Sequence, residues 1–205
     1  MPKKALKGSN TDEESKETSQ KLIDVAVDLF SDKGFKATSI REIAMAMGMT
    51  TSNIYHYYGT KAGLLTAIEQ NTLTPLMAEF RRIKALDLPP IERFVTLLRT
   101  HLSYMHTHRK ETKIFSFYEE STPLSKKFQT ETYKIYRSEI ERLAESVGRD
   151  INASVATFCT LGVVIWFLRW YDPKGRIPIE EIIESMTDFV LSGIIGVNYE
   201  GKKKR

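Results

Sequence analysis

The sequence predicts an all-α protein: an N-terminal three-helix helix-turn-helix domain followed by a larger C-terminal helical bundle. Apolar residues recur at spacings of three and four along most of the 205 residues. No sustained alternation of apolar and polar residues, and no Asn-Gly or Asp-Gly pair, predicts a β-hairpin. Helix-breaking residues separate the apolar stripes, at Pro89-Pro90, Gly148 and the turn sequence 172–175. Roughly nine helices are expected by this reading.

The chain begins with a polar segment, residues 1–15, which predicts a flexible arm. Thr11 and Glu14 match a capping box, so the first helix is expected to start there or a few residues later. This segment has no apolar core of a signal peptide, and the single cysteine, Cys159, cannot form an internal disulfide. Cys159 sits in an apolar run and is expected to be buried. These features predict a cytoplasmic protein.

Two short helices are predicted between residues 39 and 58. Ser39 and Glu42 form a capping box, and Gly48 stands where the first helix must end. A second short helix, capped by Thr50 or Thr51 and directed inward at Ile54, would present hydrogen-bonding side chains outward. Such side chains suit base edges and phosphates in a major groove. On spacing alone, a helical hairpin with a solvated polar face is an equally good interpretation.

The wider segment, residues 22–65, resembles the N-terminal domain of the TetR/AcrR family of transcriptional repressors. The matching runs are Ala26-Val27-Asp28-Leu29-Phe30, Lys33-Gly34-Phe35, Thr38-Ser39-Ile40-Arg41-Glu42-Ile43-Ala44 and Ile54-Tyr55-His56-Tyr57-Tyr58, with Lys61 and Leu64-Leu65 behind them. The family often has Phe where this chain has Tyr58, a change that keeps the ring. The resemblance implies an arm at 1–15, a helix-turn-helix domain at 16–62, a ligand-binding and dimerisation domain at 63–199 and a basic tail at 200–205.

The resemblance also implies which residues face double-stranded operator DNA. Tyr55 and Lys61 would hold phosphates, while Arg41 and the residues from 51 to 57 would be the candidates for reading bases. The formal charge of +4 adds nothing here, because the last four residues carry all of it. The DNA-facing residues are Thr38, Arg41, Thr50, Thr51, Ser52, Asn53, Tyr55, His56, Tyr57 and Lys61.

The remaining apolar stripes predict longer helices, of which the last two, at about 152–171 and 178–197, are the most apolar. In the family, this part of the chain binds a small effector and forms the dimer. Two such helices from each subunit would form a four-helix interface in a homodimer. The alternative is that both helices are simply core.

The segment 166–176 resembles TetR-family members that respond to acyl-CoA thioesters. Arg169 could pair with a phosphate and Trp166 or Trp170 could stack on a purine. The alternative is that both tryptophans pack at the dimer seam, with Arg169 in an ordinary ion pair. We therefore expect no cofactor but a small apolar effector, with acyl-CoA as one candidate. The expected ligand-binding residues are Leu102, Met105, Phe115, Tyr118, Tyr133, Phe158, Trp166, Arg169 and Trp170.

Other classes of protein are disfavoured by the sequence. His101 and His108 lie two helical turns apart, about 10 Å, which is too far for one metal ion. No phosphate loop, nucleophile elbow or His-Glu-x-x-His motif predicts an enzyme, so no catalytic residue is assigned. The longest apolar run, residues 161–168, is too short to span a bilayer. A helical adaptor remains the other alternative to a DNA-binding repressor.

Overall fold

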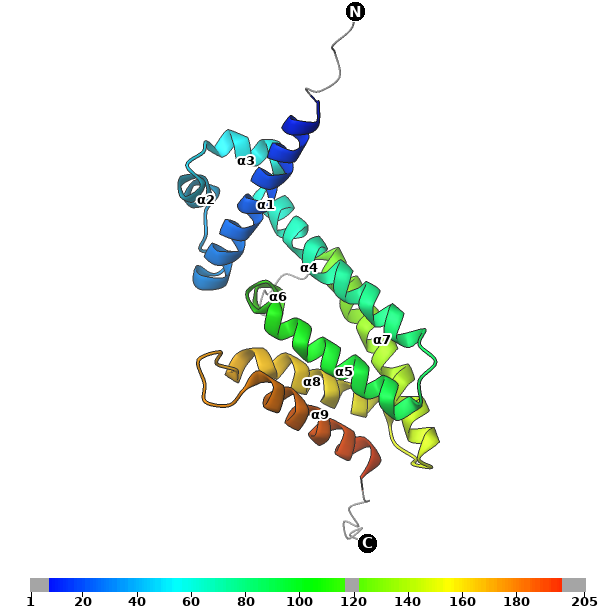
Figure 1. The fold of residues 1–205 in the computed structure, drawn as a ribbon. Helices are drawn as coiled ribbons and strands as arrows, with labels where there is room; N and C mark the ends of the chain where they lie inside the picture. Colours follow the sequence, from blue (N-terminus) through cyan, green and yellow to red (C-terminus); the bar gives the residue numbers. More distant parts are fainter. Residues whose placement is uncertain (1–7, 117–121, 197–205) are drawn as a thin grey trace, which may run out of the picture. The chain divides into compact units, whose positions relative to one another are not determined.

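The computed structural model describes residues 8–116 and 122–196 of the chain, and within them it contains nine α-helices and no strand (Figure 1). This confirms the predicted fold class and places every long apolar stripe on a helix. The helices are α1 (Gly8–Lys33), α2 (Ile40–Met47), α3 (Thr51–Tyr58), α4 (Lys61–Lys84), α5 (Pro90–Thr107), α6 (Arg109–Ser116), α7 (Pro123–Ser146), α8 (Ala153–Trp170) and α9 (Ile179–Ile195).

The chain forms two compact units that do not follow the predicted boundary after residue 62. The first unit comprises residues 1–74 and 110–125, and the second comprises residues 75–109 and 126–205. The division within α4 falls directly before Pro75, which lies inside that helix. Proline lacks the backbone N–H that would bond one turn back. The helix-turn-helix therefore belongs to a unit that also includes the first half of α4 and nearly all of α6.

The core of the first unit joins α1, α2, α3, α4 and α6. Leu22, Ile43, Ile54 and Leu64 are buried in one cluster, and each comes from a different helix among the first four. Phe115 of α6 packs against the same cluster. Phe115 was expected to line an effector cavity in the second domain; it lies instead in the first unit, and its contact with an effector stays a prediction. Because Phe115 packs against residues about fifty or more positions earlier in the chain, no local sequence pattern indicates this contact.

Helix α1 starts at Gly8, so residues 8–15 are helical and the predicted arm was too long. Extending a helix that is already nucleated by a packed segment costs far less than starting one. In the turns that follow, Thr18 Oγ1 donates to the Glu14 carbonyl at 2.8 Å, and Glu17 and Lys21 form an ion pair at 2.7 Å. The start of the arm and the basic tail lie outside the described residues.

The second unit is built from the end of α4 with α5, α7, α8 and α9. Helices α5, α8 and α9 pack against one another, and they lie side by side in Figure 1. On the other side, the ring of Phe80 in α4 lies 6.2 Å from Tyr136 of α7. A buried ion pair joins Arg93 of α5 to Glu139 of α7 at 2.6 Å. This unit therefore has its own core, separate from that of the first.

Candidate nucleic-acid interface

Helix α2 starts at the capping box that the sequence predicts. The Ser39 N–H donates to a Glu42 carboxylate oxygen at 2.8 Å, and the Glu42 N–H donates to Ser39 Oγ at 3.2 Å. The Lys33 ammonium bonds the same carboxylate at 2.9 Å. The bond from Lys33, followed by those from Ser39, lowers the Glu42 pKa to about 2. The carboxylate is thus ionised at neutral pH and closes the first turn of α2.

The turn between α2 and α3 depends on Gly48, which has a φ of +63°. Its N–H and that of Met49 reach back to carbonyls of the last turn of α2, ending the helix in the left-handed conformation. The next helix starts after Thr50, which lies at the N-cap position without capping through its side chain. Instead, Thr50 Oγ1 donates to the side-chain oxygen of Asn53 at 2.7 Å. The Asn53 amide is therefore oriented locally, with its NH2 group directed away from that bond.

The outer face of α3 is polar and exposed. Ser52, Asn53, Tyr55 and His56 are exposed, and only Ile54 of this helix is buried. Arg41 of α2 is exposed as well. The buried Ile54, together with the partly buried Tyr57 and Tyr58 that pack against the same core, fixes the roll of α3, so the exposed residues expected to face DNA project outward together. Thr51 is half-buried, at the start of the helix.

Two residues expected to face DNA are used inside the unit instead. Thr38 is 1% exposed, and its hydroxyl donates to the carbonyls of Gly34 and Leu29 at 3.0 and 3.2 Å. It ties the end of α1 to the start of α2, and its assignment as a DNA-facing side chain is wrong. Lys61 Nζ donates to the carbonyls of Phe35 and Thr38 at 2.6 and 2.7 Å.

The ammonium of Lys61 also lies 4.3 Å from the centre of the Phe35 ring. Desolvation by burial lowers the Lys61 pKa from its ordinary value. Two of its three N–H donors are already engaged by backbone carbonyls. Lys61 therefore joins the start of α4 to the segment between α1 and α2, a role different from the expected phosphate contact.

The tight passage from α3 to α4 depends on a glycine that sequence reasoning missed. A Cβ built on Gly63 would lie 2.1 Å from the Tyr58 carbonyl oxygen. The hydroxyl of Thr60 accepts from the Gly63 N–H at 2.9 Å. Only a residue without a side chain allows the two helices to approach this closely.

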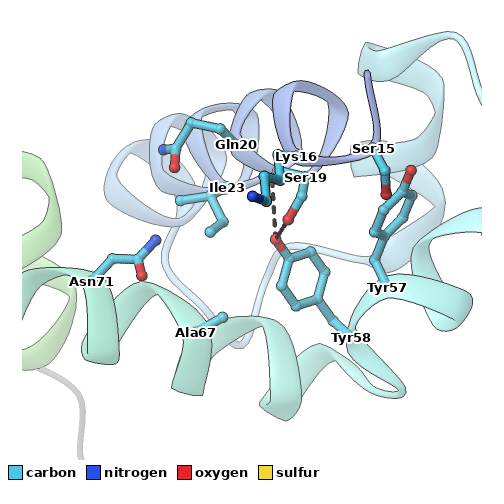
Figure 2. A pocket seen from close by; sticks show the side chains of 9 residues that line it. All are labelled: Ser15, Lys16, Ser19, Gln20, Ile23, Tyr57, Tyr58, Ala67 and Asn71. Carbon is cyan, nitrogen blue, oxygen red and sulfur yellow. Dashed lines mark hydrogen bonds between the residues drawn. The ribbon is translucent and has the colours of Figure 1, made fainter. Parts of the chain in front are cut away.

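A shallow polar groove of about 430 Å³ lies beside the last turn of α3 (Figure 2). Tyr58 donates to the Ser19 carbonyl at 3.0 Å and shares a 2.7 Å hydrogen bond with the Ser19 hydroxyl, which joins α3 to α1. Tyr57 is half-buried and points its ring into the groove rather than fully outward. The lining residues are Ser15, Lys16, Ser19, Gln20, Ile23, Tyr57, Tyr58, Ala67 and Asn71.

The residues expected to bind an effector do not converge in the second unit. Leu102 and Met105 are buried in α5, and Tyr133 of α7 is half-buried with its ring 5.2 Å from that of Phe158. Tyr118 lies outside the described residues. Phe158, Trp166, Arg169 and Trp170 are exposed on α8, so Phe158 does not line a closed pocket between helices of the single chain, and the contacts expected of the other three with an effector stay predictions. Hydropathy alone could not separate these exposed apolar side chains from core ones.

Helices α8 and α9 expose an apolar surface, defined here by Val155, Phe158, Ile165, Trp166, Trp170 and Phe189. Their exposed fractions run from 46% for Ile165 to 72% for Phe189. Cys159 is exposed on α8 too, so the expectation that it is buried is wrong. By length and composition alone α8 could cross a membrane, although helices of water-soluble proteins pass the same test. A contiguous apolar patch of this kind marks an interaction surface.

The C-terminal end of α8 is anchored by residues that the sequence did not single out. Arg109 donates to the Tyr171 carbonyl at 2.8 Å, and its guanidinium lies 5.9 Å from the Tyr171 ring centre. The Tyr171 ring stacks on Phe167 at 4.8 Å and meets His106 edge-on at 5.4 Å. This aromatic group fixes the position from which Arg169 and Trp170 project.

Comparison with known proteins finds two family models that match this chain. The family model described as "Bacterial regulatory proteins, tetR family" matches residues 22–68. A second, described as "Tetracyclin repressor-like, C-terminal domain", matches residues 87–194, more than half of the chain. The HTH-type transcriptional repressor KstR2 of Rhodococcus jostii (strain RHA1) is 28% identical over 183 residues, which cover 84% of this chain and 89% of that protein.

Solved structures agree with these matches. A TetR/AcrR-family transcriptional regulator from Thermobifida fusca YX-ER1 is 30% identical, with a TM-score of 0.66 over 86% of this chain and 98% of the other. AibR, solved in complex with isovaleryl coenzyme A and operator DNA, is 24% identical, with a TM-score of 0.72 over 84% of this chain and 97% of the other. At that identity the second likeness shows the fold. The named relatives are transcriptional regulators rather than enzymes, and both family models describe regulators of this kind.

Proposed function

Because this chain belongs to the tetR family of bacterial regulatory proteins, we propose that it acts as a homodimeric transcriptional repressor. It binds a two-fold symmetric operator and is released from it by a small apolar effector. The observation that carries this proposal is the exposed polar face of α3, held outward by the buried Ile54 and the partly buried Tyr57 and Tyr58. A helix of that kind, following a tight glycine turn, fits a major groove.

In this proposal the residues of α3 divide by chemistry. Ser52, Asn53 and His56 read base edges, since their side chains are short or planar hydrogen-bonding groups. The exposed side chains of Tyr55 and Arg41 bind phosphates, so that Arg41, implied by the resemblance to be a base-reading candidate, is proposed instead as a phosphate contact from α2. Thr50 orients Asn53 and contributes through it.

The proposed dimer is formed by the exposed apolar surface of α8 and α9. The large side chains Phe158, Trp166 and Phe189 are each more than 60% exposed in the single chain, and a second copy would remove them from water. Two recognition helices in such a dimer read half-sites about 34–36 Å apart. A cytoplasmic location follows from access to chromosomal DNA.

The effector is proposed to bind in the second unit, with an acyl-CoA thioester as the leading candidate. The AibR complex with isovaleryl coenzyme A supports this class of ligand. The guanidinium of Arg169, exposed near the end of α8 and not part of that apolar surface, has the chemistry to pair with the phosphates of such a ligand. Release requires the effector to bind the state that cannot hold DNA more tightly than the state that can.

Fluorescence anisotropy tests the proposal directly. Purified chain is titrated against labelled DNA fragments from upstream of its own gene, with unrelated DNA as a control, at two salt concentrations. We expect specific binding by one fragment and its relief by an acyl-CoA. Binding that never exceeds the unrelated control on any upstream or genomic fragment would refute the repressor assignment. Specific binding that no acyl-CoA relieves would refute the effector class alone.

A further inference from the structure

The core of the second unit contains a buried pair of titratable side chains that the DNA-binding face does not use. His101 of α5 is 3% exposed and Tyr136 of α7 is fully buried. His101 Nδ1 and Tyr136 Oη lie 3.0 Å apart in a hydrogen bond. Burial lowers the His101 pKa to about 3 and raises that of Tyr136 above its ordinary value. Both side chains are therefore neutral at pH 7.

The hydrogen bond with Tyr136 uses only one of the two imidazole nitrogens of His101. His101 Nε2 is buried and meets no hydrogen-bond partner in the described part of the chain. A phenol is the stronger acid of the pair and an imidazole nitrogen the stronger base, so Tyr136 donates to Nδ1. The proton of the neutral imidazole then resides on Nε2. The core accordingly holds an N–H donor with nothing to accept from it.

A second orphaned polar atom lies in the same region. Thr132 of α7 is 4% exposed, and its hydroxyl has no hydrogen-bond partner among the described residues. Other buried threonines in this unit donate to the carbonyl one turn back in their own helix, so the Thr132 hydroxyl is turned away from its helix. Those threonines are Thr157, Thr160 and Thr187.

The two orphaned atoms belong to one cluster around the ring of Phe80. That ring lies 4.9 Å from His101, 6.2 Å from Tyr136 and 6.5 Å from Phe128. Thr132 is one turn after Phe128 and one turn before Tyr136, on the same face of α7. Thr132 therefore lies on the face of α7 that carries Tyr136 toward Phe80 and His101.

We propose that His101 Nε2–H and the Thr132 hydroxyl bind a neutral carbonyl oxygen on an otherwise apolar effector. This inference rests on the proposed effector-binding role of the second unit and narrows the chemistry of its ligand. The cations closest to this region are already engaged, since the buried Glu139 carboxylate pairs with the partly buried Arg93 at 2.6 Å and with the exposed Arg142 at 3.2 Å. A carboxylate or phosphate would therefore find no available cation at this site. A ketone or ester oxygen satisfies the donors without burying a charge.

The test uses three eight-carbon probes at millimolar concentration: 2-octanone, 1-chlorooctane and octanoate. Binding is measured by calorimetry, and the imidazole nitrogens are followed by nitrogen-15 NMR. We expect 2-octanone to bind most tightly and to shift the His101 signals. We expect 1-chlorooctane, which lacks a good acceptor, to bind about fivefold to tenfold more weakly without that shift.

Two variants remove the donors while preserving shape. The double change His101→Phe/Tyr136→Phe replaces both members of the hydrogen bond and leaves neither orphaned. Thr132→Val removes only the hydroxyl, and Thr160→Val is its matched control, because the Thr160 hydroxyl bonds its own helix. We expect each of the first two variants to reduce the preference for 2-octanone over 1-chlorooctane, since each leaves only one donor, and the control to keep the full preference. Melting curves verify that each variant is folded.

Several outcomes would overturn the inference. These are equal binding of ketone and chloroalkane by the unmodified chain, tighter binding of octanoate, no binding of any probe, or an unchanged ketone preference in folded donor variants. Operator binding by the unmodified chain is measured on the same preparation. A failure there counts against the proposed repressor function, whereas the ketone preference tests the site by itself.

Discussion

Replacing Lys61 by alanine separates a structural from a phosphate-binding role for this side chain. The substitution removes two hydrogen bonds from an ammonium to backbone carbonyls, at 2.6 and 2.7 Å, and the contact with the Phe35 ring. The Lys61 side chain is half-buried, so the loss is smaller than for a fully buried group. We expect the first unit to lose about 1–3 kcal/mol of its free energy of unfolding.

The matched substitution is Arg41→Ala, which removes an exposed cation that the proposed function places on a phosphate. Each phosphate contact contributes about 0.9 to the slope of log affinity against log salt concentration. We expect Arg41→Ala to reduce that slope by about one and to leave stability within about 0.5 kcal/mol. We expect Lys61→Ala to leave the slope unchanged and to lower the stability of the helix-turn-helix.

The assay combines operator titrations at four salt concentrations with hydrogen exchange of the α2 and α3 amides. Exchange reports local stability of the first unit, whatever the second unit does. The reasoning fails if the α2 and α3 amides of the Lys61→Ala variant exchange as slowly as those of the unmodified chain, and if the slope of its log affinity against log salt concentration falls by about one. That result would restore the phosphate contact implied by the family resemblance.

Three further outcomes are expected. Gly48→Ala should lower the free energy of unfolding by about 1 kcal/mol, because Gly48 has a positive φ. Gly63→Ala should lower it more and weaken operator binding further, since its Cβ would meet the Tyr58 carbonyl. Equal effects of the two variants in thermal melts and anisotropy would contradict this. Phe189→Asp should weaken self-association at least tenfold in analytical ultracentrifugation, while Ile91→Asp on α5 should not, and equal effects would reject the α8–α9 interface. The folded chain holds the imidazole of His101 neutral down to about pH 3, so between pH 6.5 and 3 only the unfolded chain binds this proton. The lowered His101 pKa therefore reduces the free energy of unfolding as pH falls, by up to about 1.4 kcal/mol per pH unit. In denaturant titrations, the free energy of unfolding of His101→Phe/Tyr136→Phe should depend less steeply on pH than that of the unmodified chain.

Local sequence determined the helix-turn-helix almost completely. The capping box at Ser39 and Glu42 and the left-handed Gly48 were both predicted and both observed, because each is satisfied by neighbours within a few residues. The exposed face of α3 followed from the same local pattern, with Ile54 as its one buried residue. Family resemblance then extended the prediction to DNA, which spacing alone did not decide.

Contacts between distant segments were decided only by the tertiary structure. The family resemblance implies that Lys61 faces DNA, but its ammonium bonds the carbonyls of Phe35 and Thr38, which folding brings to it from 26 and 23 residues earlier in the chain. Phe115 joins the core of the first unit for the same reason. Phe158 was expected to line a pocket between helices, although it is 66% exposed in the single chain. Helical periodicity shows which residues share a face, whereas the partner of that face depends on how remote helices pack.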